Sequence, residues 1–255
     1  MNLFFWLGRG FFRVLQDSGG IFLFFWQALL YTFTPPLRLR LFIKQMEFIG
    51  VRSWLVVSLT ALFSGMVTAY QVHHALVKFG GQSVLGGVVA LTLTRELGPV
   101  LSAIMVVARA GSAITAELGS MRITEQIDAL KIMAVNPIQY LVTPRLWAAM
   151  IVVPLLTAMA DLIGIAGGYL IGVMVLGIDH GIFIARMQDM VELIDIMSGI
   201  YKSIFFGAFM VAVCCYKGYF AKGGAEGVGR ATTEAVVISS VGILVSDYIM
   251  TTLFF

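Results

Sequence analysis

The sequence predicts an all-α integral membrane protein with five transmembrane helices. Of its 255 residues, 59% are hydrophobic and only 12% are charged, whereas soluble globular domains carry about 25% charged residues. The mean hydropathy is +0.93. The alternating ten-residue strands of an outer-membrane barrel are absent from the sequence. The 27 glycines suit the close approach of helices in lipid.

Residues 1–36 are predicted to form a helical elbow at the cytosolic membrane surface. Two pieces rich in Phe and Trp meet at Gly19-Gly20, and each is shorter than the roughly 20 residues that a span needs. Arg9 and Arg13 lie four residues apart, so they share one helical face. Aromatic residues on the other faces are typical of an interfacial helix. One tilted span from Leu3 to Phe33 is the alternative.

A single membrane domain, residues 1–255, is expected, with a five-span core over residues 37–255. The predicted spans cover about residues 54–77, 84–117, 146–176, 196–216 and 235–255. The second is longer than a straight span requires, and Pro99 is expected to bend it. In the third span, Gly164, Gly168 and Gly172 recur every four residues. This small-residue face predicts tight contact with another helix.

The charge distribution predicts a cytosolic N-terminus and a C-terminus on the outer side of the membrane. Basic residues favour the cytosolic side of a membrane protein. Most of the 17 basic residues fall on the side assigned to the cytosol: Arg9, Arg13, Arg38, Arg40, Lys44, Arg52, Arg122, Lys131, Arg145, Lys217, Lys222 and Arg230. Only Lys78, Arg186 and Lys202 fall on or near the outer side. The formal net charge of +3 gives no sign of nucleic-acid binding, and none is expected.

The second span carries four charged residues: Arg95, Glu96, Arg109 and Glu117. Charges in hydrocarbon are costly and usually serve a function, so Arg95 and Glu96 predict a polar site suited to a charged headgroup. The alternative is a set of structural ion pairs between helices. Adjacent residues do not face each other on a helix, so Arg95 and Glu96 each need another partner. The sequence suggests no partner for Arg109.

Residues 124–134 are predicted to form a short amphipathic helix on the cytosolic side. Thr124 is the expected N-cap, with acidic residues in the first turn. Its apolar stripe consists of Ile123, Ile127, Leu130 and Ala134. Helices that rest on anionic lipid usually have a basic polar face. This one is mostly acidic, which favours docking on a protein over resting on lipid.

Several other patterns predict no chemistry in this chain. Residues 224–231 approach a phosphate-binding loop, but Arg230 and Ala231 replace the required Lys and Ser or Thr. We therefore expect a turn there, before a helix capped near Thr232 or Thr233, and any ATPase must be another subunit. Cys214 and Cys215 are expected to be buried core residues. The histidines lack metal-binding spacing, and no catalytic set is present.

Three stretches resemble the MlaE-type permeases, the membrane subunits of ABC transporters associated with MCE proteins, which move lipids across the envelope of diderm bacteria. They are RELGPVLSAIMVVARAGSAITAELGSMRITEQIDAL at 95–130, AVNP at 134–137 with PRLWA at 144–148, and GRATTEAVVISS at 229–240. The resemblance covers essentially the whole chain, in order and at compatible spacing.

The resemblance implies a homodimer in the bacterial inner membrane, each subunit having an elbow and five spans. It implies a cytosolic ABC ATPase, in some members a small STAS-domain protein, and a hexameric periplasmic MCE ring. Lipid is expected in a cavity between the two permeases. No cofactor is expected in this chain, because the ATPase would use the ATP and Mg. The family's intramembrane Arg-Glu pair falls on Arg95 and Glu96, and its coupling helix on Thr124 to Leu130.

These expectations give one main hypothesis, ATP-driven phospholipid transport that maintains the lipid asymmetry of the outer membrane. The expected substrate contacts are Arg95, Glu96 and Lys202 for the headgroup and Leu76, Phe79 and Tyr70 for the acyl chains. The residues expected to couple to the ATPase are Glu117, Arg122, Glu125, Ile127, Asp128 and Leu130.

Two other functions are compatible with the sequence. A proton-driven secondary transporter would use Glu96, Glu117 or Asp161, although the sequence lacks the inverted repeats common in that class. A membrane anchor for envelope proteins that transports nothing would not need the charges of the second span.

Overall fold

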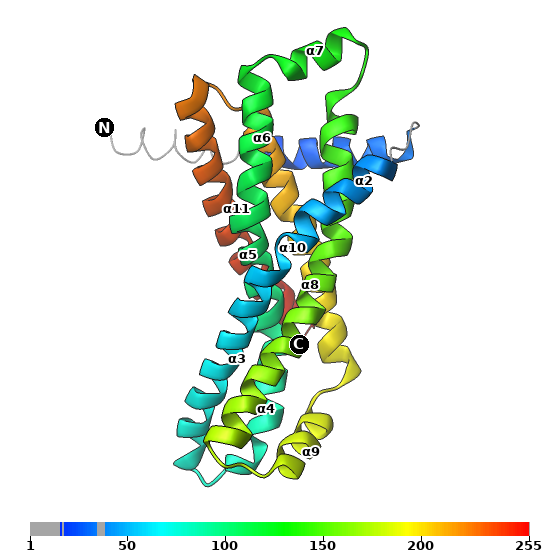
Figure 1. Ribbon diagram of the computed structural model, residues 1–255. Coiled ribbons are helices and arrows are strands. Elements are labelled where there is room, and N and C mark those ends of the chain that lie inside the picture. Colours follow the sequence, from blue (N-terminus) through cyan, green and yellow to red (C-terminus); the bar gives the residue numbers. More distant parts are fainter. Residues whose placement is uncertain (1–15, 17, 35–38, 255) are drawn as a thin grey trace, which may run out of the picture.

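The computed structural model describes residues 16, 18–34 and 39–254, and no strand occurs among them. Five helical stretches are long and apolar enough to cross a membrane: Leu39–Val77, Gln82–Ile123, Ile138–Val175, Leu193–Tyr219 and Gly224–Phe254. This confirms the predicted all-α fold with five spans (Figure 1). The predictions for Arg9, Arg13 and Arg38 concern residues outside the described part of the chain.

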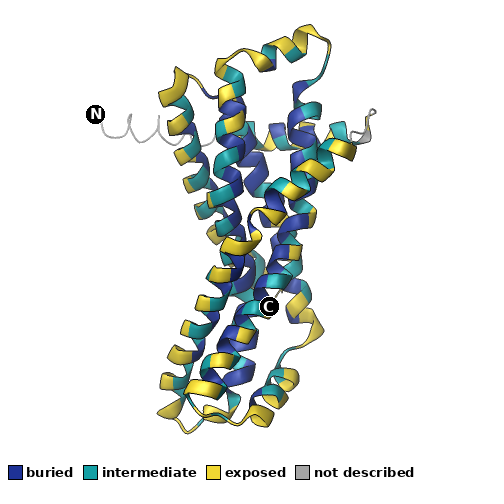
Figure 2. Cartoon of the chain, in the orientation of Figure 1, coloured by how far each residue is buried: buried dark blue, intermediate teal, exposed yellow. Residues whose placement is uncertain are grey.

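The five stretches form an elongated bundle (Figure 1). One end carries helix α7 (Gln126–Ile132) and the other carries α9 (His180–Met190), and we call these the α7 end and the α9 end. Helix α8 (Thr143–Tyr169) lies between α3 (Trp54–Val77) and α10 (Leu193–Tyr219), and α11 (Gly224–Phe254) packs on α10. Buried residues line the inside of the bundle, whereas the outer sides of the helices are exposed (Figure 2).

Small residues hold α3 against α8, as the glycine spacing predicts. A side chain at Gly65 would overlap the carbonyl group of Gly164, and one at Gly167 would overlap the carbonyl group of Leu62. At Gly168 and Gly172, added side chains would meet the side chains of the neighbouring helices. The two backbones therefore approach as closely as in other small-residue helix contacts in membranes.

The first span confirms its predicted bounds, because α3 covers Trp54–Val77. The basic segment before it is also helical. It consists of α2 (Leu39–Met46) and the π-helical turn η2 (Glu47–Val51), which cross α8 before the chain turns into α3. Helical structure therefore begins well before the apolar span itself.

The second span is a continuous helical stretch with two wide turns. It runs from η3 (Gln82–Val84) through α4 (Leu85–Thr92), the π-helical η4 (Leu93–Leu97), α5 (Gly98–Val106) and the π-helical η5 (Val107–Gly111) to α6 (Ser112–Ile123). Pro99 lies at the start of α5, directly after η4. Arg95 and Glu96 lie within η4 and Arg109 within η5, so each wide turn carries charge, as is frequent at functional sites.

An apolar helix, Ser18–Leu30, precedes the 3-10 turn η1 (Tyr31–Phe33). It runs across the long helices (Figure 1) and is too short to span a membrane. Phe24 anchors it among the rings of Tyr216, Tyr219 and Phe220. The hydroxyl group of Thr143 donates a hydrogen bond to the carbonyl oxygen of Ala28. Phe22 and Trp26 remain exposed, and the membrane-surface position of the elbow stays a prediction.

Two local predictions at the α7 end are wrong. Helix α7 covers only Gln126–Ile132, and its N-cap is Glu125, which has a left-handed φ of 60°. Thr124 instead donates its hydroxyl hydrogen to the carbonyl oxygen of Ser120, within the end of α6. The glycine-rich segment 224–231 forms the first turns of α11, not a loop. Glycine-rich segments are poor helix formers, so packing of α11 on α6 and α10 outweighs local propensity there.

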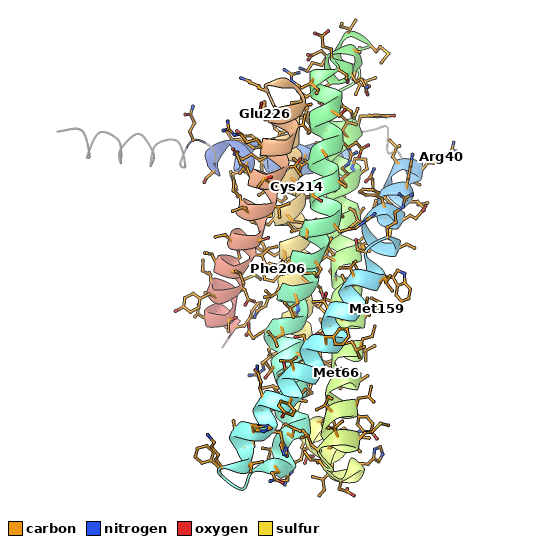
Figure 3. All side chains as sticks on the ribbon, turned by 60° about the vertical axis from the view of Figure 1, so that its left-hand side comes forward. Arg40, Met66, Met159, Phe206, Cys214 and Glu226 are labelled. Carbon is orange, nitrogen blue, oxygen red and sulfur yellow. The ribbon has the colours of Figure 1, made fainter. Side chains whose placement is uncertain are left out.

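The buried cysteines agree with expectation, whereas the third and fifth spans begin several residues earlier than predicted, at Ile138 and Gly224. The outer connection contains α9, capped by Asp179, whose carboxylate accepts a hydrogen bond from the backbone N–H of Ile182. The third span begins with the π-helical turn η6 (Ile138–Val142) and ends with η7 (Leu170–Val175). Cys214 and Cys215 are free and buried. Figure 3 shows Cys214 and Phe206 inside the bundle.

Candidate functional site

The predicted Arg95 site is a charged network that joins three helical stretches. The guanidinium group of Arg95 contacts Oδ1 of Asp195 at 2.5 Å from Nη2 and 2.6 Å from Nε. Asp195 is fully buried at the start of α10. Its Oδ2 also accepts the backbone N–H of Glu192 at 2.9 Å. Arg95 therefore binds the carboxylate that caps α10.

Lys202 is the centre of the second part of this network. Its ammonium group donates to the carbonyl oxygen of Arg95 at 2.9 Å, to Oε2 of Glu96 at 2.9 Å and to the hydroxyl oxygen of Thr251 at 2.8 Å. These three bonds use all three donors of a lysine. Oδ1 of Asp247 lies 3.1 Å from the same nitrogen, and this fourth contact is ionic.

Pro99 explains why the carbonyl group of Arg95 is available. A proline has no N–H to donate to the carbonyl group four residues earlier, which here belongs to Arg95. Lys202 supplies the missing donor from α10. The hydrogen bond from Lys202 therefore compensates for the interruption at Pro99 and fixes η4 against α10.

The network is open to the surface on the side of Arg95 and Glu96. Their side chains are 31% and 35% exposed, whereas Lys202 is 0% exposed. A ligand that approaches the site therefore meets Arg95 and Glu96 first. The direct headgroup contact predicted for Lys202 stays a prediction, but in this conformation its position is that of an internal counter-ion.

The charges within the network do not cancel. Two cations, Arg95 and Lys202, face three carboxylates, Asp195, Glu96 and Asp247. Buried ions need partners because desolvation is expensive, and each cation here has at least one carboxylate within 3.1 Å. The arrangement places a partly exposed guanidinium group and a partly exposed carboxylate side by side on an apolar bundle, which suits a ligand that carries both charge and hydrocarbon.

Sequence reasoning missed Asp195, Asp247 and Thr251 as members of the network. Asp195 directly precedes the predicted fourth span, at the edge of the segment that connects it to the third span, yet its side chain is fully buried. Asp247 is an acidic residue in an apolar span, and this is the same signal that identified Arg95. Thr251 carries no comparable signal, because threonine is common in membrane helices.

The residues predicted to contact acyl chains lie towards the α9 end of α3. Tyr70 is 51% exposed and Phe79 86% exposed, while Leu76 packs against the small core cluster around Phe183. Within the described residues no hydrogen bond or ion pair connects them with the charged network. Their role in binding lipid stays a prediction.

The acidic face of α7 forms its own ion cluster. Arg122, at the end of α6, donates to both carboxylate oxygens of Asp128 at 2.9 and 3.0 Å, and Lys131 donates to Oδ1 at 2.9 Å. The hydrogen bond from Lys131, helped by Arg122, holds the pKa of Asp128 below its usual range. Glu125, at the N-cap, is exposed.

The apolar stripe of α7 points inwards more than predicted. Ile127 is completely buried in the core of this chain, so in this conformation its side chain holds α7 in place and is not a contact surface. Leu130 is half-buried against the same core. The exposed apolar side chains are instead those of Ile132 and Met133, at 86% and 63%.

Two further charges connect the elements below α7. Oε2 of Glu117 on α6 lies 2.8 Å from Nη2 of the buried Arg145 on α8. Arg109, for which the sequence suggested no partner, donates to the carbonyl oxygen of Phe48 and to the hydroxyl group of Ser53. Its guanidinium carbon also lies 4.8 Å from the centre of the Phe48 ring. Arg109 thereby fixes the turn between η2 and α3 to the second span.

Asp161 lies in α8 beside Gly98 and is mostly buried. Its Oδ1 has no hydrogen-bond partner among the described residues. The proton-transport hypothesis names three acidic residues. Glu96 and Glu117 each form an ion pair with a cation, whereas Asp161 forms none among the described residues. Among the described residues no group of three His, Cys, Asp or Glu side chains is arranged to hold a metal ion.

Comparison with known proteins gives a consistent result. The family model described as Permease MlaE matches residues 42–253. A probable ABC transporter permease protein of Rickettsia felis is 45% identical over 249 residues, which is 98% of this chain and 96% of that protein. The intermembrane phospholipid transport system permease protein MlaE of Haemophilus influenzae is 42% identical over 216 residues, 84% of this chain and 83% of that protein.

A plant protein is also similar. The chloroplastic protein TRIGALACTOSYLDIACYLGLYCEROL 1 of Arabidopsis thaliana is 39% identical over 213 residues, 84% of this chain and 61% of that protein. The matched region of the family model includes the whole charged network and α7. With five apolar helical stretches in the matched order, this chain belongs to the MlaE permease family.

Proposed function

We propose that this chain is the membrane subunit of an ATP-driven transporter that moves phospholipid between the inner membrane and a periplasmic MCE protein. The observation that carries the proposal is the partly exposed pair Arg95 and Glu96 at the edge of a buried charged network. A guanidinium group binds phosphate well because its planar fork matches two oxygens. Apolar side chains dominate the rest of the bundle and suit acyl chains.

In this proposal the α7 end faces the cytosol. Basic residues gather at that end, as the positive-inside rule requires. Helix α7 would dock on an ABC ATPase through its exposed apolar residues Ile132 and Met133 and the acidic Glu125. That ATPase would bind the ATP and Mg. The α9 end would face the MCE protein, and transport would maintain the lipid asymmetry of the outer membrane.

A homodimer is part of the same proposal. Helix α11 is the most exposed of the five stretches, with 11% of its apolar window buried. Its outer residues Val241, Val245 and Tyr248 are 55%, 55% and 73% exposed. A second copy near this face would cover the exposed side chains of Arg95 and Glu96, since Thr251 of α11 already contacts Glu96.

The second span would carry the motion from motor to lipid. It runs without a break from Gln82 to Ile123, and the 28 steps from Arg95 to Ile123 cover about 42 Å at 1.5 Å per residue. The ion pair between Glu117 and Arg145 couples it to α8 on the way. Movement of α7 therefore reaches η4 through one continuous element.

The test is ATP-dependent transfer of labelled phospholipid from proteoliposomes that contain the chain and its ATPase to a soluble acceptor. We expect Arg95→Ala to reduce transfer at least about tenfold, since a charge-assisted bond to phosphate contributes roughly 1.5–3 kcal/mol. Arg40→Ala, at an exposed arginine of α2 that belongs neither to the charged network nor to α7 or α9, is the matched control and should transfer normally.

The alternatives give different results in the same assay. Transfer that needs a proton gradient, proceeds without ATPase and is lost in Asp161→Asn would identify a secondary transporter. A complex that assembles and functions equally well with Arg95→Ala and Glu96→Ala would identify an anchor. Failure of the purified chain to retain any ATPase would also overturn the proposal.

A further inference from the structure

A polar pocket of about 420 Å³ lies near the α7 end, away from the charged network of Arg95. It is bounded by α2 and η2 on one side and by α6, η6 and the start of α8 on the other. Its volume is within the usual range of small-molecule sites. The lining residues that the argument uses are Lys44, Glu47, Arg52, Glu117, Pro144 and Arg145.

The pocket has an excess of positive charge. Arg145 and Glu117 contact each other at 2.8 Å and cancel. Of the other charged lining residues, Lys44 and Arg52 are positive and Glu47 is negative, which leaves one positive charge in excess. None of these three side chains forms an ion pair with another described residue. A ligand with one negative charge would complete the balance.

Arg145 gives the pocket a fixed, buried donor. Its side chain is 3% exposed and is held by Leu141, whose carbonyl oxygen accepts from Nη1 at 2.5 Å. Its Nε has no partner among the described residues. A guanidinium group held in this way needs no reordering to bind an oxyanion, which favours binding.

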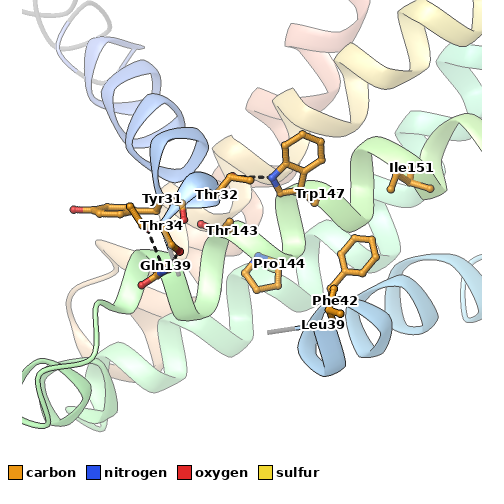
Figure 4. Close-up of a pocket in the computed structure, with 10 residues that line it drawn as sticks. All are labelled: Tyr31, Thr32, Thr34, Leu39, Phe42, Gln139, Thr143, Pro144, Trp147 and Ile151. Carbon is orange, nitrogen blue, oxygen red and sulfur yellow. Dashed lines mark hydrogen bonds between the residues drawn. The ribbon is translucent and has the colours of Figure 1, made fainter. Parts of the chain in front are cut away.

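The surroundings of the pocket are apolar and exposed. Leu39, Ile43 and Val51 beside it are 69%, 63% and 63% exposed. Behind α2 lies a second pocket of about 320 Å³, whose lining includes Leu39, Phe42, Trp147 and Ile151 (Figure 4). Pro144 contributes to both pockets. The charged pocket and the apolar pocket thus lie on two sides of α2. They would match the charged headgroup and the acyl chains of a phospholipid, whereas free phosphate has no hydrocarbon part.

We propose that the polar pocket binds the phosphodiester headgroup of an anionic phospholipid, with acyl chains along α2 and the apolar pocket behind it. Lys44 and Arg52 contribute charge, and Arg145 provides directed donors. Such a lipid would bridge α2 to α6 and α8, directly below α7. The site is separate from the lipid-transport site at Arg95, and the proposal does not depend on that function.

The experiment measures crosslinking of two photoactivatable lipids to the full chain in phosphatidylcholine nanodiscs. One probe is phosphatidylglycerol with a diazirine close to its glycerol backbone, and the other is phosphatidylcholine with the same group. Peptide mass spectrometry maps the sites. We expect phosphatidylglycerol to be enriched over phosphatidylcholine at residues 39–52 and 139–151 and not at residues 70–96.

The variants test the charges directly. A basic residue near an anionic lipid surface contributes about fivefold in affinity, so the double variant Lys44→Gln, Arg52→Gln should lower the apparent affinity for phosphatidylglycerol about 25-fold. Glu47→Gln should raise it. Arg40→Gln is the matched control, because Arg40 is an exposed arginine one helical turn before Lys44 (Figure 3) and does not line the pocket, so this change should have little effect. These side chains are exposed, and thermal unfolding checks that each variant folds.

Three outcomes would overturn the proposal. The first is equal crosslinking of the two lipids at residues 39–52. The second is an equal loss in Arg40→Gln, which would indicate general attraction to a basic surface. The third is loss of the signal on adding millimolar inorganic phosphate at constant ionic strength, which would identify a soluble-phosphate site. Variants of Arg95 distinguish the two sites, since they should leave the crosslinks at residues 39–52 unchanged.

Discussion

The ammonium group of Lys202 lies 2.9 Å from the carbonyl oxygen of Arg95, the oxygen that Pro99 leaves without its helical donor. One buried side chain thus supplies the missing donor at a backbone interruption and is the shared cation of two carboxylates, Glu96 and Asp247. The consequence is that the position of η4, and with it the exposed Arg95 and Glu96, depends on a residue that is itself inaccessible.

We expect Lys202→Met to destabilise the protein by about 3–5 kcal/mol, because it leaves Glu96 and Asp247 without their shared cation. Thermal unfolding of the purified protein measures the loss. Adding Glu96→Gln and Asp247→Asn to the lysine variant should recover much of it. Additive losses in the combined variant would show that the three side chains do not act as one unit.

Ile132→Ser should weaken association with the ATPase at least about tenfold while leaving the stability of the isolated chain unchanged. Ile132 is 86% exposed on α7, and exposed apolar side chains at an interface centre contribute most of its energy. Co-purification of ATPase gives the measurement. Phe79→Ser, at an equally exposed residue of the α9 end, is the control, and an equal loss there would argue against docking through α7.

The carboxyl group of Asp128 should titrate below its ordinary pKa. Lys131 and Arg122 stabilise the charged form. Its contribution to holding α7 is therefore complete above the ordinary pKa of an aspartate, and it is lost as the pH falls through the lower, folded-state pKa. Carboxyl NMR of the labelled protein measures this pKa, and Lys131→Gln should raise it. An unchanged pKa in that variant would contradict the assigned cause.

Gly65→Ala should destabilise the protein by about 1–3 kcal/mol, as is usual for overpacking. The added methyl group would overlap the carbonyl group of Gly164 and separate α3 from α8. Gly229→Ala is the matched control, since Gly229 is also helical and has open space around it. There we expect a gain of about 0.5–1 kcal/mol from helix propensity. Thermal unfolding of both variants shows whether the first is destabilised and the second stabilised, as expected.

Much of the fold could be predicted because the hydrophobicity of a segment in a membrane protein indicates whether that segment spans the membrane. The first span, predicted at about residues 54–77, matches α3 closely, since a basic segment precedes it in the sequence. The glycine spacing of α8 also predicts a real close contact, because only small residues allow it.

The errors have a different cause. Segment 224–231 is helical because α11 packs along its length on its neighbours, and a local glycine-rich pattern carries no information about them. The partner of Arg109 is a backbone carbonyl group on Phe48, and every residue type offers one. The charged network joins residues about one hundred positions apart, such as Arg95 and Asp195. The sequence could show that partners were needed, but not which residues they were.

The π-helical turns have a consequence for comparing members of the family. Each such turn holds one residue more than an α-helical turn, so a one-residue deletion within η4 or η5 would restore regular winding while the later side chains keep their present faces. In this way a deletion in η5 would leave Glu117 on α6 facing Arg145, whereas the same deletion in a regular helical turn would rotate it away by about 100°. Alignments that place gaps only in loops would miss such changes.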